Sequence, residues 1–202
     1  MTTVHADELF AVLSQPPQSQ RFEFLFDTPS ASATALAQWI EARATLADPL
    51  FSAVIEQASG RALGRQALMR IKPEHGVIEI GNILWSTTMA RTRLATEALY
   101  LTARHVFEDL GYRRLEWKCD ARNTASRRAA LRFGFRFEGI FEQHMWIKGR
   151  NRDTAWFAML DRSWPQLREQ YDAWLAAENF DATGCQRQRL HTSSGADATA
   201  SC

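Results

Sequence analysis

The hydrophobic positions in the middle of the chain switch between strand-like and helix-like spacing. Residues 76–85 are rich in β-branched and aromatic side chains between glycine and a Ser-Thr-Thr turn, which predicts a strand. From Ala95 onward apolar residues recur every three or four positions as far as Gly111, which predicts a helix with glycine just past its end. A second strand over 115–119 and a second helix over 123–133 follow. A crossover of this length pairs its two strands in parallel.

The rest of the pattern predicts antiparallel strands and further helices around this unit. Strands are expected over residues 21–26, 51–56, 62–71, 136–148 and 152–161, the last four as two hairpins. Helices are expected over residues 9–13, 30–45 and 163–175. Ser163-Trp-Pro-Gln166 is typical of a capping box with proline in the first turn. The predicted fold class is therefore α/β (α+β) with a mixed, mostly antiparallel central sheet.

Length and composition predict one domain with a tail. A chain of 202 residues with 46% hydrophobic content supplies one sizeable core. Beyond residue 180 the chain turns to Thr, Ser, Gly, Ala and Gln and buries little apolar surface. We therefore expect a domain over residues 1–180 and a disordered tail over residues 181–202.

Charge and cysteine content narrow the function classes. The 24 Lys and Arg nearly balance the 23 Asp and Glu, which argues against a nucleic-acid partner or an anionic membrane surface. The sequence holds no run of about 18 apolar residues that would predict a membrane span. The three cysteines follow neither a metal-site spacing nor a disulfide framework. We expect a cytoplasmic protein without a metal site.

The start of the helix near Ala95 is a candidate anion site. A helix N-terminus carries unpaired N–H groups and partial positive charge, and Arg91 and Arg93 add full charges beside it. Two arginines there are unfavourable without an anion, although Glu97 partly offsets them, and an exposed basic turn without a ligand is the alternative. The groups assigned to a phosphate-bearing ligand are Arg91, Thr92, Arg93 and the N–H groups of Leu94, Ala95 and Thr96.

These motifs, in this order, resemble a known family. The motifs are Glu79-Ile-Gly81, Arg-x-Arg-x-Ala-Thr-Glu-Ala over 91–98, Asn123-x-x-Ser126 and Phe133-Gly-Phe-x-Phe-Glu-Gly139. Over about residues 21–178 the chain resembles the GNAT superfamily of acetyl-CoA-dependent N-acetyltransferases. Within it, the chain looks most like the branch of the ribosomal-protein N-terminal acetyltransferases RimJ and RimL. The resemblance implies a single-domain fold with a splayed parallel strand pair, helices on both sheet faces, and acetyl-CoA as acyl donor.

One residue departs from the family pattern. The family's pyrophosphate loop usually reads Gln/Arg-x-x-Gly-x-Gly/Ala, and this chain has Ala90 in the Gln/Arg position and Arg93 in the Gly position. Glycine allows the backbone to wrap closely around a phosphate. An Arg93 guanidinium offers direct phosphate contact instead.

Glu79 is the candidate general base. An α-amino group is mostly protonated at neutral pH, so a base or a water relay assists its attack. Strand alternation places Glu79, Gly81 and Ile83 on one face, and the resemblance implies that this strand lines the cleft. The alternative is a Glu79 that pairs with an arginine on an exposed face of the sheet.

Ser126 is the candidate acid for the leaving thiolate and Asn123 the candidate pantetheine contact, both by resemblance. Asn and Ser are also preferred helix caps, and sequence alone favours that interpretation. The resemblance further implies that a backbone N–H near Leu84 or Trp85 stabilises the oxyanion.

The predicted function is transfer of acetyl from acetyl-CoA to a primary amine by direct attack in a ternary complex. The acceptor is a protein or peptide N-terminus, or a small amine, and the protein is a monomer or homodimer. The alternative is a catalytically weak CoA-binding module that acts through interactions. A nucleic-acid binder is the least favoured class because the charges nearly balance.

Overall fold

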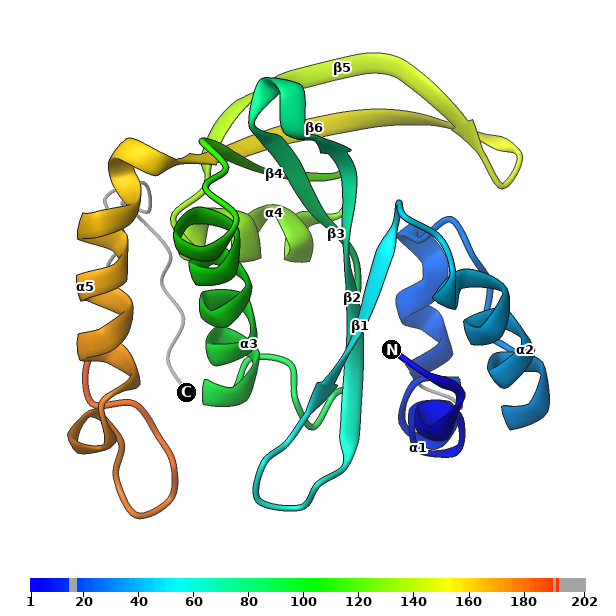
Figure 1. Cartoon of the computed structure of the whole chain (residues 1–202), viewed down its shortest axis with the longest axis horizontal. Helices are drawn as coiled ribbons and strands as arrows, with labels where there is room; N and C mark the ends of the chain where they lie inside the picture. Colours follow the sequence, from blue (N-terminus) through cyan, green and yellow to red (C-terminus); the bar gives the residue numbers. More distant parts are fainter. Residues whose placement is uncertain (15–17, 191, 193–202) are drawn as a thin grey trace. The chain divides into compact units, whose positions relative to one another are not determined.

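The computed structural model describes residues 1–14, 18–190 and 192 (Figure 1). The chain divides into a first unit, Met1–Lys72 with Ile78–Ala95, and a second, Pro73–Val77 with Thr96–Cys202. The α-helices in the described part are α1 (Ala6–Leu13), α2 (Ala33–Ala44), α3 (Arg93–Arg104), α4 (Thr124–Arg132) and α5 (Trp164–Leu175). The strands there are β1 (Leu50–Ile55), β2 (Ala62–Lys72), β3 (Val77–Trp85), β4 (Arg114–Asp120), β5 (Arg136–Ile147) and β6 (Arg150–Leu160).

The fold class expected from the sequence is confirmed. The chain forms a six-stranded mixed sheet with one parallel pair, together with helices. The strand order is β1-β2-β3 in the first unit and β4-β6-β5 in the second. The two predicted hairpins are present as antiparallel pairs, β1 with β2 and β5 with β6.

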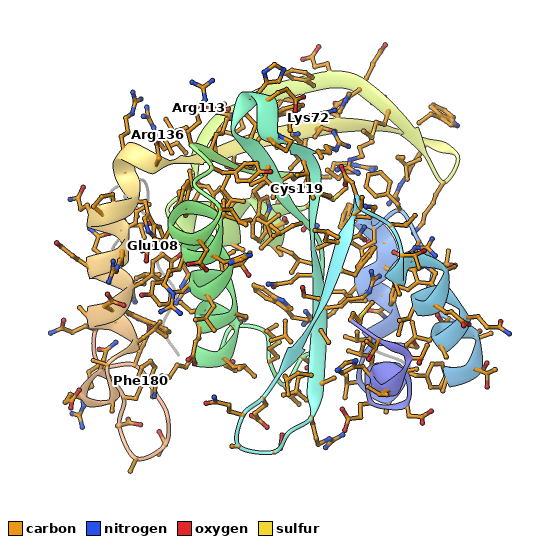
Figure 2. All side chains as sticks on the ribbon, in the orientation of Figure 1. Lys72, Glu108, Arg113, Cys119, Arg136 and Phe180 are labelled. Atoms are coloured by element: carbon orange, nitrogen blue, oxygen red, sulfur yellow. The ribbon has the colours of Figure 1, made fainter. Side chains whose placement is uncertain are left out.

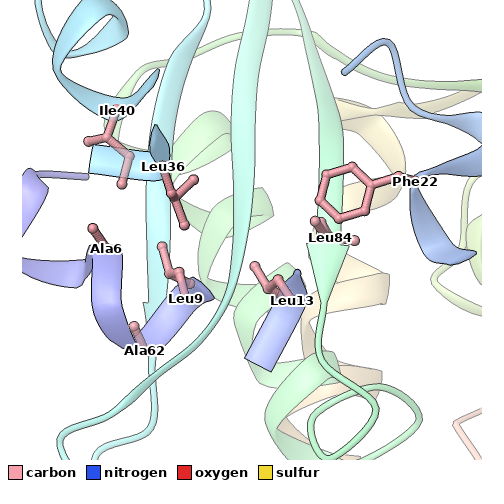
Figure 3. Packing of buried hydrophobic residues seen from close by; sticks show 8 residues of the cluster. All are labelled: Ala6, Leu9, Leu13, Phe22, Leu36, Ile40, Ala62 and Leu84. Atoms are coloured by element: carbon pink, nitrogen blue, oxygen red, sulfur yellow. The ribbon is translucent and has the colours of Figure 1, made fainter. Parts of the chain in front are cut away.

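The core of the first unit lies between α1, α2 and the strands (Figure 3). Apolar residues at helical spacing bring both helices together over β2 and the end of β3. The buried members of this cluster are Ala6, Leu9, Leu13, Phe22, Leu36, Ile40, Ala62 and Leu84. The α2 helix begins at a serine cap, because the Ser32 hydroxyl accepts a hydrogen bond from the N–H of Ala35 at 3.0 Å.

The strand predicted over residues 21–26 is wrong. Gln18–Phe24 forms a 3₁₀-helix, which has three residues per turn. Phe22 and Leu25, three residues apart, both pack against the α1–α2 cluster. The alternating phenylalanines mimic a strand, but burial of this i, i+3 pair decides the conformation.

The core of the second unit includes the α3–α5 contact. The α3 helix continues into a π-helical turn, His105–Asp109, and ends before Gly111, whose φ is +67°. Glu108 is labelled in Figure 2. Its carboxylate accepts a hydrogen bond from Trp164 Nε1 at 2.8 Å. The rings of Tyr100 and Trp164 stack at 5.9 Å, so α5 is fixed to α3 by aromatic packing as well.

The predicted capping box at the start of α5 is also wrong. Ser163 is the N-cap residue, but its side chain makes no capping hydrogen bond. A 3₁₀-helix, Asp161–Ser163, leads into α5 and holds Ser163 in a helical rather than an extended conformation. The hydroxyl of an N-cap residue reaches the helix N–H groups from the extended conformation.

The segment after α5 is described as far as residue 190, with residue 192. The Asp181 carboxylate accepts hydrogen bonds from the N–H groups of Thr183 and Cys185, each at 2.9 Å. Residues 191 and 193–202, most of the second half of the predicted disordered tail, lie outside the described residues, and that prediction stays a prediction. Cys119 is free and buried. In the described part of the chain no helix has both the length and the hydrophobicity to span a bilayer.

Candidate active site

Glu79 is a buried carboxylate on β3 with an arginine partner. Its side chain is 5% exposed, and its Oε2 lies 3.3 Å from Arg70 Nε on β2. Gly81 leaves room for it, since an added Cβ there would lie 3.2 Å from Glu79 Oε1 and 2.7 Å from Met69 Sδ. The arginine partner of the alternative hypothesis is therefore present; the Arg70 side chain is 37% exposed, whereas Glu79 is buried.

A left-handed residue interrupts the alternation of β3. Asn82 has a φ of +51°, which is uncommon for any residue other than glycine. After Asn82, the consecutive side chains of Leu84 and Trp85 are both buried. The shared face predicted for Glu79, Gly81 and Ile83 stays a prediction.

Leu84 and Trp85 belong to the core of the first unit through their side chains. Trp85 Nε1 donates to Gln66 Oε1 at 3.2 Å, and the Trp85 carbonyl accepts from Arg21 Nη1 at 3.2 Å. Gly64 of β2 lies close against them, because a Cβ there would be 2.9 Å from Trp85 Cδ1. Because both side chains are buried, a ligand would contact these two residues through their backbone atoms.

The loop before α3 folds on its own hydrogen bonds and presents the predicted arginines to solvent. The Ser86 carbonyl accepts from Ala90 N–H at 2.8 Å, and the Thr92 hydroxyl donates to the Met89 carbonyl at 2.5 Å. Arg91, Thr92 and Arg93 are exposed, Leu94 is half-buried, and Ala95 and Thr96 are buried.

The backbone strain in this loop falls on Arg91 rather than on Arg93. Arg91 has a φ of +70°, whereas Arg93 is the first residue of α3. The departure from the family's glycine at Arg93 therefore carries no left-handed strain. Strained residues cluster at functional sites, which makes the loop at Arg91 a candidate site on conformational grounds.

The first turn of α3 also contacts a half-buried arginine, Arg132. Arg132, at the end of α4, donates from Nη1 to Thr96 Oγ1 at 3.1 Å, and its guanidinium lies over the Trp174 ring. Burial lowers the pKa of Arg132. No carboxylate within the described part of the chain pairs with it. No local sequence signal marks this residue, because Thr96 and Arg132 meet only in the folded chain.

Asn123 and Ser126 form the predicted cap of α4. The Asn123 side-chain oxygen accepts from the N–H of Ser126 at 3.0 Å, and Ser126 Oγ accepts from Trp117 Nε1 at 2.9 Å. Burial raises the pKa of the Cys119 thiol, and a hydrogen bond with Ser126 opposes this shift. The capping interpretation is thus confirmed for Asn123, while the cofactor and acid roles stay predictions.

We expect Ser126→Ala to lower the free energy of unfolding by about 1–2 kcal/mol, because Trp117 Nε1 loses its hydrogen-bond acceptor. Thr124→Ala, at an exposed position of the same turn, is the control and is expected to change stability by less than about 0.5 kcal/mol. Urea unfolding followed by tryptophan fluorescence measures both. Equal stability of the two variants would contradict a structural role for the Ser126 hydroxyl.

Comparison with known proteins places the chain in a family. The family model described as "Acetyltransferase (GNAT) domain" matches residues 1–136. A crystal structure of a GCN5-related N-acetyltransferase from Brucella melitensis is 56% identical and covers 93% of this chain and 85% of its own, with a TM-score of 0.90. No curated protein matches.

Two further solved structures are more distant. A protein from Chromobacterium violaceum described as a GNAT-family acetyltransferase is 40% identical over 82% of both chains, with a TM-score of 0.76. A Vibrio cholerae protein described as a ribosomal-protein-serine acetyltransferase is 22% identical over 79% of this chain and 90% of its own. Its TM-score is 0.67, so it shares the fold. The chain therefore belongs to the GNAT family of acetyltransferases and is an acyltransferase.

Proposed function

We propose that the protein transfers the acetyl group of acetyl-CoA to a primary amine by direct attack in a ternary complex. The observation that carries the proposal is the excess of positive charge at the start of α3. Arg91 and Arg93 are exposed there, and the half-buried Arg132 donates a hydrogen bond to Thr96 and pairs with no carboxylate in the described residues. Cations beside a helix N-terminus are unfavourable unless an anion is bound there. The phosphates of acetyl-CoA fit this donor set.

The proposal gives the remaining residues separate tasks. Arg91, Thr92, Arg93 and the N–H groups of Leu94, Ala95 and Thr96 hold the phosphates, with Arg132 as an added cation. Asn123 contacts the pantetheine, the backbone near Leu84 and Trp85 donates to the developing oxyanion, and Ser126 protonates the leaving thiolate.

Glu79 acts as the base in this proposal. Its carboxylate is paired with Arg70, and the absence of a side chain at Gly81 leaves room for it. The position of the carboxylate is therefore preorganised. The amine acceptor, once deprotonated, attacks the thioester carbonyl, the carbon–sulfur bond breaks, and the thiolate takes a proton. Water between Glu79 and the amine serves equally well as a relay.

The acceptor class is proposed as a peptide N-terminus or a small amine. The RimJ/RimL-like motifs favour a peptide, whereas the Vibrio cholerae structure supports the fold alone. We further propose a cytoplasmic monomer or homodimer without a nucleic-acid partner, because acetyl-CoA and nascent protein N-termini are both available in the cytoplasm.

The function is tested by incubating the protein with acetyl-CoA and a mixture of peptides, amino acids and polyamines. We expect free thiol release that depends on an amine, and a product heavier by one acetyl group in mass spectrometry. CoA binding without product across the whole mixture would favour the alternative, a CoA-binding module.

We expect Arg93→Ala and Arg132→Met each to weaken CoA binding by about tenfold, as loss of one charge-assisted phosphate contact does. Arg128→Ala, exposed on α4, is the control and is expected to bind CoA like the wild type. Isothermal titration calorimetry with CoA measures all three. Unchanged affinity in both Arg93→Ala and Arg132→Met would remove the arginines from the phosphate site.

A further inference from the structure

A cavity of about 370 Å³ lies in the first unit, apart from the start of α3. Its volume is at the lower end of the roughly 300–1,000 Å³ typical of small-molecule sites. Its walls come from α2, the segment before it, the start of β1 and the left-handed residue Asn82 of β3. None of the residues assigned to acetyl-CoA lines it.

Three aromatic residues line the cavity. Trp39 of α2 and Phe51 of β1 meet edge to face with ring centroids 4.9 Å apart. Phe26 adds a third ring that is 45% exposed although it is large and apolar. Rings in this arrangement favour an apolar, preferably aromatic, ligand group.

Asn82 supplies a buried hydrogen-bond acceptor that lacks a donor in the described residues. Its Oδ1 is buried and makes no hydrogen bond to any residue that the structure describes. A buried acceptor without a donor is costly, and a ligand N–H removes the cost. Asn82 lies three residues after Glu79 on the same strand.

The charge at the cavity is positive. Asp27 lines it but is paired with the buried Arg65 at 2.5 Å, so these two charges offset each other. Arg43 then contributes one further positive charge, with its guanidinium 4.2 Å from the Trp39 ring centroid. This charge disfavours polyamines and favours a carboxylate or carbonyl oxygen next to the amine.

We propose that this cavity selects the acceptor: an α-amine whose carbon carries a large apolar side chain, which the three rings enclose. Asn82 accepts a hydrogen bond from the acceptor N–H, and Arg43 faces its carboxylate or carbonyl. The proposal rests on the proposed acetyl transfer. The acceptor is a free amino acid or a peptide N-terminus, since both present this chemistry.

The test compares acceptors by kcat/KM at saturating acetyl-CoA: L-phenylalanine, L-phenylalaninamide, the peptide Phe-Ala-Gly, L-alaninamide and spermidine. We expect the best phenylalanine compound to exceed alaninamide and spermidine by at least about tenfold. Free phenylalanine as the best acceptor indicates an amino-acid substrate, and the amide or peptide indicates an N-terminus. Equal rates for phenylalaninamide and alaninamide would overturn the proposal.

Ala42→Phe fills the cavity without removing a core side chain, because Ala42 is exposed and lines it. We expect kcat/KM for the phenylalanine compounds to fall at least about tenfold, with the KM for acetyl-CoA unchanged. Ala44→Phe, exposed on the same helix and not part of the cavity wall, is the matched control. Equal rates in the two variants would also overturn the proposal.

Failure of the cavity proposal and failure of acetyl transfer give different results. If no acceptor yields product, acetyl transfer fails, and the cavity is then tested by titration with N-acetyl-L-phenylalaninamide. Binding to the wild type and to Ala44→Phe, but weaker binding to Ala42→Phe, supports the cavity as an apolar subsite. No binding to the wild type overturns it.

Discussion

Glu79→Gln is expected to lower kcat by about 100-fold or more, the usual contribution of a positioned base. Glutamine preserves the shape of the side chain but cannot take a proton from the amine. The pH profile of the rate is expected to change in the variant, because glutamine has no ionisable group. Steady-state kinetics over a pH series measures both effects, and the affinity for acetyl-CoA stays unchanged.

The pairing with Arg70 offers a purely structural role for Glu79, and the same variant separates the two. Glu74→Gln, at an exposed position just before β3, controls for loss of a carboxylate. A structural role predicts a lower melting temperature with an unchanged kcat and pH profile. That outcome would remove Glu79 as the base and leave a water relay.

Gly134→Ala is expected to destabilise the fold by about 2–5 kcal/mol. Its φ of +87° costs an alanine roughly 1–2 kcal/mol. The added Cβ would also lie 2.6 Å from Leu167 Cδ2 of α5, and overpacking costs about 1–3 kcal/mol more. Chemical unfolding monitored by circular dichroism measures the loss.

Gly111→Ala is the matched control, because Gly111 also follows a helical turn with positive φ, at +67°. Nothing lies within 4 Å of a Cβ added there, so only the conformational cost of roughly 1–2 kcal/mol applies. The difference between the two variants isolates the packing of α5 against the end of α4. Equal losses would show that α5 does not press on Gly134.

The elements with strong periodicity were predictable from the sequence. The repeat that leads to Gly111 predicts α3, and the strand patterns over 136–148 and 152–161 predict the β5–β6 hairpin, because local pattern and tertiary packing agree there. The prediction for residues 21–26 was wrong because their apolar residues alternate in the sequence as in a strand. In the structure Phe22 and Leu25 are packed with a three-residue period, as in a 3₁₀-helix. The cap of α4 at Asn123 was predictable because capping depends on a local spacing.

The features of the candidate site that the sequence did not predict are those that depend on tertiary contacts or unusual backbone angles. Asn82 and Arg91 adopt left-handed conformations although neither is glycine, the residue that usually marks such a conformation in a sequence. The contact between Thr96 and Arg132 joins residues 36 positions apart. The cavity beside Trp39 and Phe51 likewise forms only when α2 packs beside β1.

A crystal structure with bound CoA tests the central claim most directly, since it reveals where the diphosphate lies. We expect the diphosphate oxygens within hydrogen-bond distance of the backbone N–H groups at the first turn of α3, with the Arg93 guanidinium alongside. A structure at saturating CoA in which no phosphate lies at this turn, or in which CoA is bound elsewhere on the chain, would contradict the claim.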